Sequence, residues 1–275
     1  MSEGEEPPGP GQLPELVDLE AYPLHRPGSP DYQALVSRCR ADLESDGMYD
    51  LVGFLRPSAV ERTMRELRPA IDDDSFEHRR RHNIWFLPPS RVSGVPADHP
   101  ALAEAETANR TVCADQLTGS PVLSVYEWPG LRDFLAATMR LDTLHLMADP
   151  LARVNVMSYR EGEALNWHFD RSEFTTTVLL QEPAAGGEFE FRSGLRSTPG
   201  ADLDAVGALV TGRDPHVQRR RISPGTLTVF LGRGTAHRVA PTRGDIDRVI
   251  AVFSFYEQPG VVFSPSERLG FYGRT

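Results

Sequence analysis

The sequence predicts a mainly β protein with flanking helices, and three observations support this prediction. Short runs of β-branched and apolar residues recur after about residue 150, separated by turns rich in Gly and Pro. Helical spacing of apolar residues is instead concentrated before that point. Strands and helices do not alternate regularly along the chain, so a sandwich or jelly roll is expected rather than a parallel βαβ sheet.

The first half of the chain is expected to support this β region. Residues 1–30 are rich in Pro, Gly and Glu, which predicts a disordered acidic arm, within which residues 13–24 are candidates for packing on the domain. Residues 31–150 are expected to form a mostly helical support region, with a solvated loop or helix end where three Asp precede three Arg. Helices are expected at 31–45, from 57 to before Pro69, at 99–117 and at 131–141, and strands at 49–55 and 83–87.

Residues 151–275 are expected to form the β core, and residues 31–275 together a single domain. A polar segment at 197–215 interrupts the core and is expected to be a long excursion. The strands of the core are expected at 153–159, 174–180, 188–191, 226–231, 238–240 and 248–256.

Composition excludes several classes of function. The formal net charge of −10 argues against nucleic acid or an anionic membrane as the main partner. Cys39 and Cys113 do not form a Cys-x-x-Cys pair, so a zinc ribbon is excluded. No apolar run is long enough for a membrane span, and the acidic, Pro-rich beginning is unlike a signal peptide, so a reducing cytoplasmic location is expected. The sequence does not indicate an oligomeric state.

A metal site is predicted around the segment 166–171. His168 and Asp170 are two residues apart next to a predicted strand, and alternate residues of a strand point to the same face. His237 follows a later predicted strand and can complete the set. Two imidazoles and one carboxylate form the facial triad of non-haem Fe(II) oxygenases, which leaves three positions of the metal open.

These residues also carry a resemblance to a known family. The stretch from residue 153 to 256, roughly two-fifths of the chain, resembles the Fe(II)- and 2-oxoglutarate-dependent oxygenases with prolyl-4-hydroxylase-like motifs. The resemblance implies a double-stranded β-helix core. The run 167–192, with the tail 248–272, is also similar to a bacterial group of free-amino-acid hydroxylases and radical halogenases. The matching positions are Tyr159, Gly162, His168-Phe169-Asp170, Gly186-Gly187, Pro224-Gly225, His237 and Arg248.

The resemblance assigns a role to each matching residue. His168, Asp170 and His237 would bind Fe(II), and 2-oxoglutarate and O₂ would fill the open positions. Arg248 would bind the far carboxylate of 2-oxoglutarate, because a guanidinium pairs with a carboxylate through two parallel hydrogen bonds and stays charged when buried. Arg243 and Arg238 are alternatives for this role. Tyr159 would add a hydroxyl group to the same carboxylate, with Asn155 on the same strand face.

The reaction and the substrate are predicted from residues around the triad. In the halogenating relatives a small residue replaces the carboxylate, so Asp170 favours hydroxylation. The resemblance of 167–192 and of the tail, together with the groups near the triad, implies a small polar substrate, namely a free amino acid or a derivative. Arg171 and Glu173 would offer opposite charges to a zwitterion from one strand face, or would pair with each other. The residues that flank the site and are candidates for holding the substrate are Asn83, Trp85, Trp167, Arg171, Glu173, Tyr256 and Tyr272.

Three other functions remain open at this stage. A hydroxylase of protein or peptide side chains would use the same triad, with the 197–215 excursion as part of a peptide groove. A cupin-like module that binds a metal or a ligand would have the same barrel, but it would not need Arg248 or Tyr159 to point inward. A scaffold without a metal is the third alternative.

Overall fold

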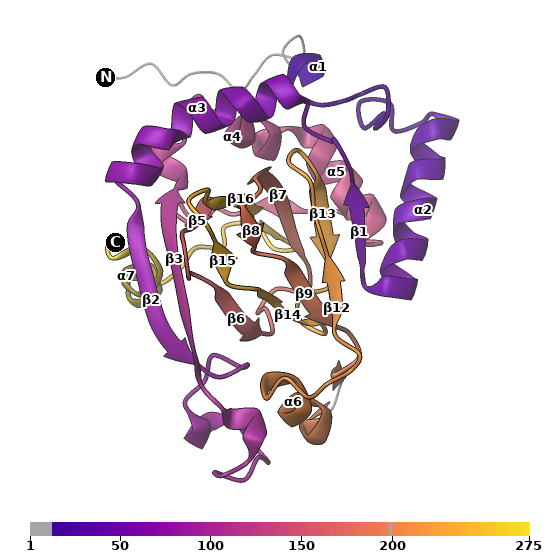
Figure 1. The fold of residues 1–275 in the computed structure, drawn as a ribbon. Coiled ribbons are helices and arrows are strands. Elements are labelled where there is room, and N and C mark those ends of the chain that lie inside the picture. The colour runs from indigo at the N-terminus through magenta and orange to yellow at the C-terminus, as the bar shows by residue number, and fades with distance from the viewer. Residues whose placement is uncertain (1–12, 198–199) are drawn as a thin grey trace.

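Two antiparallel sheets form the core of the protein in a computed structural model, which describes residues 13–197 and 200–275 (Figure 1). The protein is mainly β with flanking helices and a jelly-roll core, as the sequence predicts. The large sheet consists, in spatial order, of β1 (Met48–Leu51), β13 (Leu227–Phe230), β7 (Thr175–Gln181), β16 (Arg248–Phe253), β5 (Val154–Tyr159), β3 (Ala105–Cys113) and β2 (Phe76–His82). The small sheet consists of β12 (Gln218–Arg220), β9 (Phe189–Arg192), β14 (Ala236–Val239) and β6 (Leu165–His168).

The large sheet separates an apolar core from a cavity. On β5, Val154 and Val156 point outward into the main hydrophobic cluster, while Asn155, Met157 and Tyr159 line the cavity between the sheets. This division follows from the side-chain period of 2 in a strand. The alternation of residues in β5 therefore determines which of its side chains line the cavity.

Helices cover the outer face of the large sheet, and two more helices lie in the 197–215 excursion and near the C-terminus (Figure 1). The main cluster joins this face to α1 (Leu13–Leu16), α2 (Pro30–Asp46), α3 (Pro57–Asp73), α4 (Pro121–Glu127) and α5 (Pro129–Thr138). α6 (Leu203–Val210) lies in the predicted excursion, and α7 (Pro265–Tyr272) lies near the C-terminus. The short elements are β4 (His145–Leu146), β8 (Ala185–Gly186), β10 (Arg196–Ser197), β11 (Gly200–Ala201), β15 (Thr242–Arg243), β17 (Phe255–Tyr256), η1 (Pro89–Arg91), η2 (Pro100–Leu102) and η3 (Ala114–Gln116).

The predicted helix at 99–117 is wrong, because the middle of this segment forms the strand β3. β3 lies between β2 and β5 in the large sheet and pairs with both. Its burial is almost continuous, and this tertiary environment outweighs the weak helical spacing of its Ala and Leu residues. Residues 31–150 contain the helices α2, α3, α4 and α5, but they also contribute β1, β2 and β3 to the large sheet.

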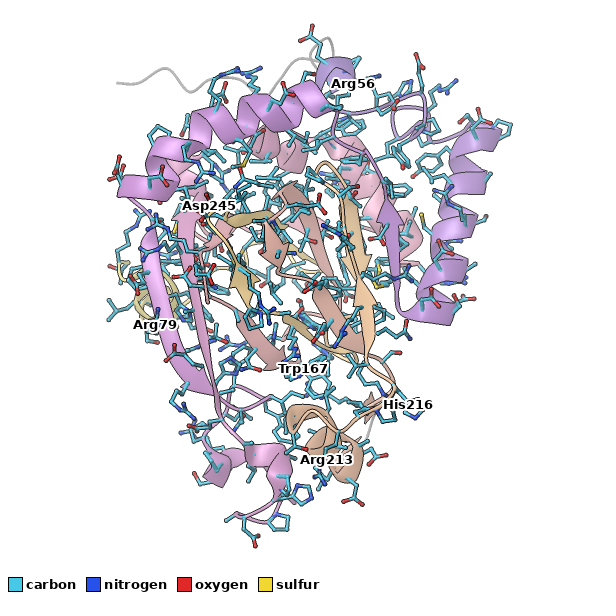
Figure 2. All side chains as sticks on the ribbon, in the orientation of Figure 1. Arg56, Arg79, Trp167, Arg213, His216 and Asp245 are labelled. Carbon is cyan, nitrogen blue, oxygen red and sulfur yellow. The ribbon has the colours of Figure 1, made fainter. Side chains whose placement is uncertain are left out.

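The three consecutive Arg residues also lie in a strand rather than in a solvated loop. Arg79 and Arg81 are exposed on the outer side of β2, where Arg79 pairs with Glu77 and Glu106, whereas Arg80 is half-buried (Figure 2). The expected strand at 83–87 is a turn. The expected end of the helix before Pro69 is also wrong, because α3 continues through this residue to Asp73.

Residues 13–29 of the predicted arm are ordered, and packing of residues 13–24 agrees with the sequence expectation. Residues 13–29 pack on the domain, with Val17 and Leu24 buried, and the backbone N–H of Asp18 donates a hydrogen bond to Phe54. Apolar side chains at these positions provide enough buried area to order the segment. Residues 1–12 of the predicted arm lie outside the described residues.

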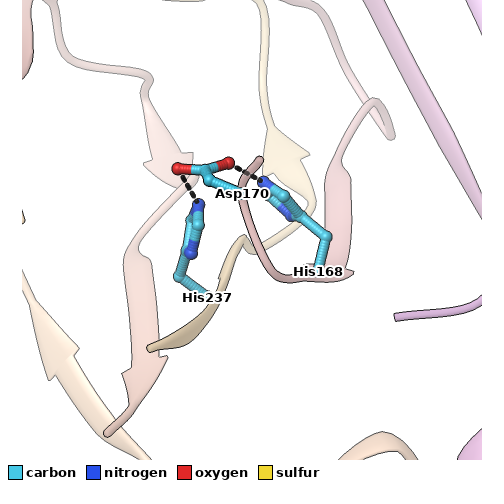
Figure 3. A group of neighbouring side chains, drawn as sticks. All are labelled: His168, Asp170 and His237. Carbon is cyan, nitrogen blue, oxygen red and sulfur yellow. Dashed lines mark ion pairs between the residues drawn. The ribbon is translucent and has the colours of Figure 1, made fainter. Parts of the chain in front are cut away.

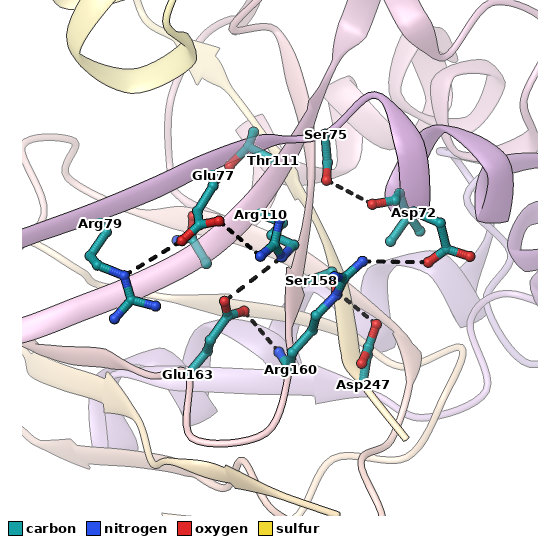
Figure 4. A network of polar contacts seen from close by, with 12 residues as sticks. Asp72, Ser75, Glu77, Arg79, Arg110, Thr111, Ser158, Arg160, Glu163 and Asp247 are labelled. Carbon is teal, nitrogen blue, oxygen red and sulfur yellow. Dashed lines mark hydrogen bonds and ion pairs between the residues drawn. The ribbon is translucent and has the colours of Figure 1, made fainter. Parts of the chain in front are cut away.

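A network of charged side chains connects the end of α3 with β2, β3 and β5 (Figure 4). Arg110 on β3 bonds to Glu77 at 2.9 Å and approaches Glu163 at 3.8 Å. Ser158 on β5 donates to Asp247 at 3.1 Å. Most of these groups are partly exposed, so each contact contributes little to stability on its own. Within the described chain, none of the helices is both long and apolar enough to cross a bilayer.

Candidate active site

His168, Asp170 and His237 converge between the two sheets (Figure 3). His168 ends β6 and lies directly opposite His237 on β14. Their Nε2 atoms are 3.4 and 3.5 Å from Oδ1 and Oδ2 of Asp170, respectively. The three potential ligand atoms lie within 4.8 Å of one another, which suits a single metal ion.

Asp170 reaches this position from a bend rather than from a strand. β6 ends at His168, and the backbone N–H of Asp170 donates to the carbonyl of Gly232 at 3.0 Å. The period of 2 therefore explains only part of the arrangement of His168 and Asp170. The turn between β13 and β14 provides the rest.

The second nitrogen of each imidazole contacts a backbone carbonyl. Nδ1 of His168 is 2.8 Å from the carbonyl of Asn166, and Nδ1 of His237 is 3.0 Å from that of Thr235. With the proton on Nδ1, each ring donates to its carbonyl and keeps the lone pair of Nε2 available to a metal ion. This is the orientation that metal-ligating histidines require.

The charges of the triad also suit a cation. Burial would raise the pKa of Asp170, but the close contacts with His237 and His168 hold this pKa well below its usual range. Thr175 donates a further hydrogen bond of 2.6 Å to Oδ2 of Asp170. Burial and the neighbouring His168 lower the pKa of His237 to about 4. At neutral pH the site therefore offers an ionised carboxylate and a neutral imidazole of His237, as a metal site requires.

Gly232 makes room for the carboxylate. A Cβ atom at this position would lie 2.1 Å from Oδ2 of Asp170 and 2.8 Å from its Cβ and Cγ. Any side chain at residue 232 would displace the carboxylate. Gly is therefore required at residue 232 because Asp170 approaches its backbone closely, and not because of an unusual backbone conformation.

A cavity of about 290 Å³ extends from the triad between the sheets. Arg248, at the start of β16, lines this cavity and is 2% exposed. Its Nη1 atom is buried and has no hydrogen-bond partner among the residues that the structure describes. A buried, unpaired guanidinium is costly, so the cavity is suited to an anion.

The residues proposed for 2-oxoglutarate differ in their surroundings. Tyr159 lies opposite Arg248 across β5 and β16, with its ring 5.8 Å from Cζ of Arg248. Asn155 also lines the cavity, but its Oδ1 accepts a hydrogen bond of 2.9 Å from Tyr272 of α7. Among the alternatives, Arg243 is exposed and Arg238 pairs with Glu190, and neither lines this cavity. A dicarboxylate with one end at Arg248 fits these surroundings.

Only two of the predicted substrate residues line the cavity, Arg171 and Tyr272. Trp167 and Trp85 pack instead in a separate cluster toward α6, and Figure 2 shows Trp167 at that end of the core. Trp167 points away from the cavity because it is adjacent to His168 in a strand. Tyr256 packs in the cluster beside α7.

The expected use of Arg171 and Glu173 is wrong in its geometry. Both residues lie in a bend, not on a strand face. Arg171 pairs with Glu267 at 2.5 Å, and Glu173 pairs with Arg233 at 3.2 Å. They neither pair with each other nor form a single charged surface in the cavity.

Several cavity residues were not identified from the sequence: His78, Arg80, Phe86 and Phe271. The alternation of residues 76–82 is a signal for the first two, since it places His78 and Arg80 on the inner face of β2. Phe86 depends on a left-handed backbone conformation (φ 54°), which the sequence does not indicate. Asn83 stabilises this turn, because its side chain bonds to the backbone of Trp85 and Leu87.

Comparisons with known proteins identify the fold. No protein-family model and no curated protein matches this sequence. Among solved structures, the non-heme alpha ketoglutarate dependent epimerase SnoN from nogalamycin biosynthesis is 16% identical, with a TM-score of 0.57 over 81% of each chain. AviO1 from Streptomyces viridochromogenes is 17% identical, with a TM-score of 0.53 over 83% of this chain and 97% of its own. A prolyl hydroxylase from Trichoplax adhaerens in complex with a peptide is 12% identical, with a TM-score of 0.50 over 81% and 90%.

The fold and the site together define a class. The chain has the jelly-roll fold found in non-haem 2-oxoglutarate oxygenases, with a His-Asp-His group between its sheets. At these identities the similarity establishes the fold only. The activity must be argued from the residues of the site.

Proposed function

We propose that the protein is an Fe(II)- and 2-oxoglutarate-dependent oxygenase that hydroxylates an unactivated C–H bond of a small polar substrate. One observation carries this proposal: a metal-ligating triad and a buried, unpaired Arg248 line the same cavity. A cupin-like metal module has no need of this second feature. A structure of SnoN in complex with Fe3+ and alpha ketoglutarate, which has a TM-score of 0.53, supports the choice of cofactors.

Each residue has a defined task in this proposal. His168, Asp170 and His237 would hold Fe(II). The metal and 2-oxoglutarate together supply the activation of O₂. Arg248 binds and orients the far carboxylate of the cosubstrate, and Tyr159 adds its hydroxyl group nearby. Apolar residues of the cavity, such as Ile250 and Phe230, exclude water from the reacting groups.

Asp170 favours hydroxylation over halogenation. Its carboxylate occupies the position between the two imidazoles, where a halogenase needs space for chloride. The product is therefore expected to gain an oxygen atom from O₂, while 2-oxoglutarate is converted to succinate and CO₂.

The size of the cavity favours a small substrate over a peptide. Its volume of about 290 Å³ is close to the lower end of the range for small-molecule sites. Phe271 and Tyr272 of α7 and Phe86 of the 83–87 turn form part of its wall. Free amino acids and their close derivatives, which the sequence resemblance suggests, are the first compounds to test. A peptide substrate, as in the Trichoplax prolyl hydroxylase complex, is the alternative.

The test is turnover by the reconstituted protein. The protein is loaded anaerobically with Fe(II) and 2-oxoglutarate, mixed with a panel of free amino acids, and exposed to isotopically labelled O₂. Succinate formation together with a product that contains one labelled oxygen atom supports the proposal, and the His237→Ala variant should form neither. A chlorinated product would contradict the hydroxylase assignment. Turnover of peptides alone would replace the small substrate with a peptide.

A further inference from the structure

Arg80 is a cation that lines the cavity, and the proposed function assigns it no role. It lies on β2 between Arg79 and Arg81, but it faces the opposite side of the strand. Its Nε is buried without a hydrogen-bond partner, and in residues 13–197 and 200–275 no carboxylate forms an ion pair with it. Arg79 and Arg81 differ, because Arg79 pairs with Glu106 and Arg81 donates to the carbonyl of Glu104. Arg80 is therefore a charged group that lacks a counter-ion among the residues that the structure describes.

Two aromatic rings hold the guanidinium of Arg80 in place. Its Cζ is 4.4 Å from the ring centroid of Phe86 and 5.4 Å from that of Phe271. Contact with the faces of these rings stabilises the planar cation and leaves its N–H edges available for an anion. The ring of Phe86 also lies 5.2 Å from that of His168. Arg80 is thus separated from the metal triad by no more than one aromatic side chain.

The backbone at Phe86 is strained to make this arrangement. A left-handed conformation is unfavourable for a bulky residue and persists only where the surrounding structure enforces it. Here Asn83 enforces it, since Oδ1 of Asn83 accepts from the N–H groups of Trp85 and Leu87 and Nδ2 donates to the carbonyl of Leu87. Such strain is typical of residues that contact a ligand.

The charges of the cavity define the ligand. Arg80, Arg171 and Arg248 line it, while the only carboxylate among the described lining residues is Asp170 of the triad. Arg171 is already paired with Glu267. His78, beside Arg80, adds no negative charge, because burial lowers its pKa to about 4 and it is neutral at neutral pH. The cavity therefore provides a partner for a second anion besides 2-oxoglutarate, but no free carboxylate for an ammonium group.

We propose that Arg80 binds a carboxylate group of the substrate, so that the substrate class is small organic acids, including amino acids recognised through their carboxylate. The proposal rests on the proposed function, since it names the substrate class of the same site. A flat carboxylate suits the N–H edge of a guanidinium that lies over the rings of Phe86 and Phe271. An ammonium group of the substrate is not recognised by a protein carboxylate, in contrast to the zwitterion clamp expected from Arg171 and Glu173.

Binding of matched ligand pairs tests this role. Protein loaded with Zn(II) and 2-oxoglutarate is mixed with free amino acids and simple aliphatic acids, and with the primary amide of each. Saturation-transfer NMR then measures their dissociation constants. The wild-type protein should bind at least one acid about tenfold or more tightly than its amide, because the amide lacks the charge that pairs with Arg80.

The variants separate this role from a structural one. Arg80→Met should abolish the preference for the acid over its amide, and Arg80→Lys should retain part of it. Arg81→Met, on the outer face of the same strand, is the matched control and should leave the preference unchanged. Affinity for 2-oxoglutarate should be the same in all variants, since Arg248 binds the cosubstrate. Thermal unfolding shows whether each variant is folded. If Arg80→Met does not fold, Arg80→Lys still provides the test.

Three results would overturn the inference. They are equal binding of acids and amides by the wild-type protein, binding of no acid in the panel, or an acid preference that survives in Arg80→Met. Failure of the proposed function looks different. In that case the Fe(II)-loaded wild-type protein neither binds nor consumes 2-oxoglutarate. The acid preference that depends on Arg80 is a separate result, because NMR measures it without turnover.

Discussion

Gly232→Ala should weaken metal binding although none of the proposed ligand residues is replaced. The added methyl group would lie 2.1 Å from Oδ2 of Asp170, far inside the ordinary contact distance, so the carboxylate must move away. Oδ2 is also the atom that accepts the hydrogen bond of Thr175. The substitution therefore disturbs both the position of the ligand and the contact that orients it.

The magnitude follows from the kind of contact that is lost. Changes to groups that orient a metal ligand typically reduce metal affinity by about 10–100-fold, or about 1.4–2.7 kcal/mol. Anaerobic calorimetric titration with Fe(II), or with Co(II) as a stable substitute, measures this change. Oxygenase activity at saturating metal should fall as well, because the open positions of the metal shift with Asp170.

Gly234→Ala is the matched control in the same turn. A Cβ at residue 234 would meet its nearest neighbour, the carbonyl oxygen of Arg196, at 3.7 Å, which is an ordinary contact. This variant should bind metal like the wild-type protein. Equal metal affinities in the wild-type protein and a folded Gly232→Ala variant would refute the assignment of Asp170 as a ligand.

Two further predictions concern buried charges. Arg248→Met should weaken 2-oxoglutarate binding by about 2–5 kcal/mol, measured by calorimetry. It should also raise the free energy of unfolding of the ligand-free protein, because it removes an unpaired buried cation. A loss of both the affinity and the stability would indicate a structural role for Arg248. Burial lowers the pKa of His82 from 6.5 to about 4, so unfolded His82 takes up a proton between these values while folded His82 does not. The free energy of unfolding should therefore fall as the pH is lowered from about 6.5 to about 4, and urea titrations of His82→Asn should show a smaller fall.

Local patterns predicted the β core and the three residues that the structure brings together as a candidate metal site. The strands between residues 153 and 256 have apolar runs and Gly/Pro turns that identify them without knowledge of their partners. His168 was identified because it lies two residues from Asp170 ahead of a predicted strand, and His237 because it follows another predicted strand. The metal triad therefore depends on features that short segments of sequence already contain.

Contacts between distant segments could not be predicted in the same way. β3 has a helix-like composition and becomes a strand only because β2 and β5 flank it. The position of Asp170 depends on Gly232, sixty-two residues further along the chain. Arg171 and Glu173 were expected to act together because they are close in sequence, but their partners are Glu267 and Arg233.

The position of Arg80 also depends on contacts between distant segments. Sequence alone groups it with two exposed Arg residues in a charged run. Pairing of β2 with β3 separates it from both neighbours and turns it toward the cavity. A residue that defines the substrate class in our proposal was therefore hidden in a segment with the composition of a solvated loop.

Anaerobic absorption spectroscopy tests the central claim most directly. The wild-type protein is titrated with Fe(II), with 2-oxoglutarate and with both, and the visible spectrum is recorded each time. A weak charge-transfer band should appear only when both are present, and it should be absent in His237→Ala and require much more 2-oxoglutarate in Arg248→Met. No band in the wild-type protein with both ligands, or an unchanged band in His237→Ala, would contradict the assignment of this site as an Fe(II)/2-oxoglutarate centre.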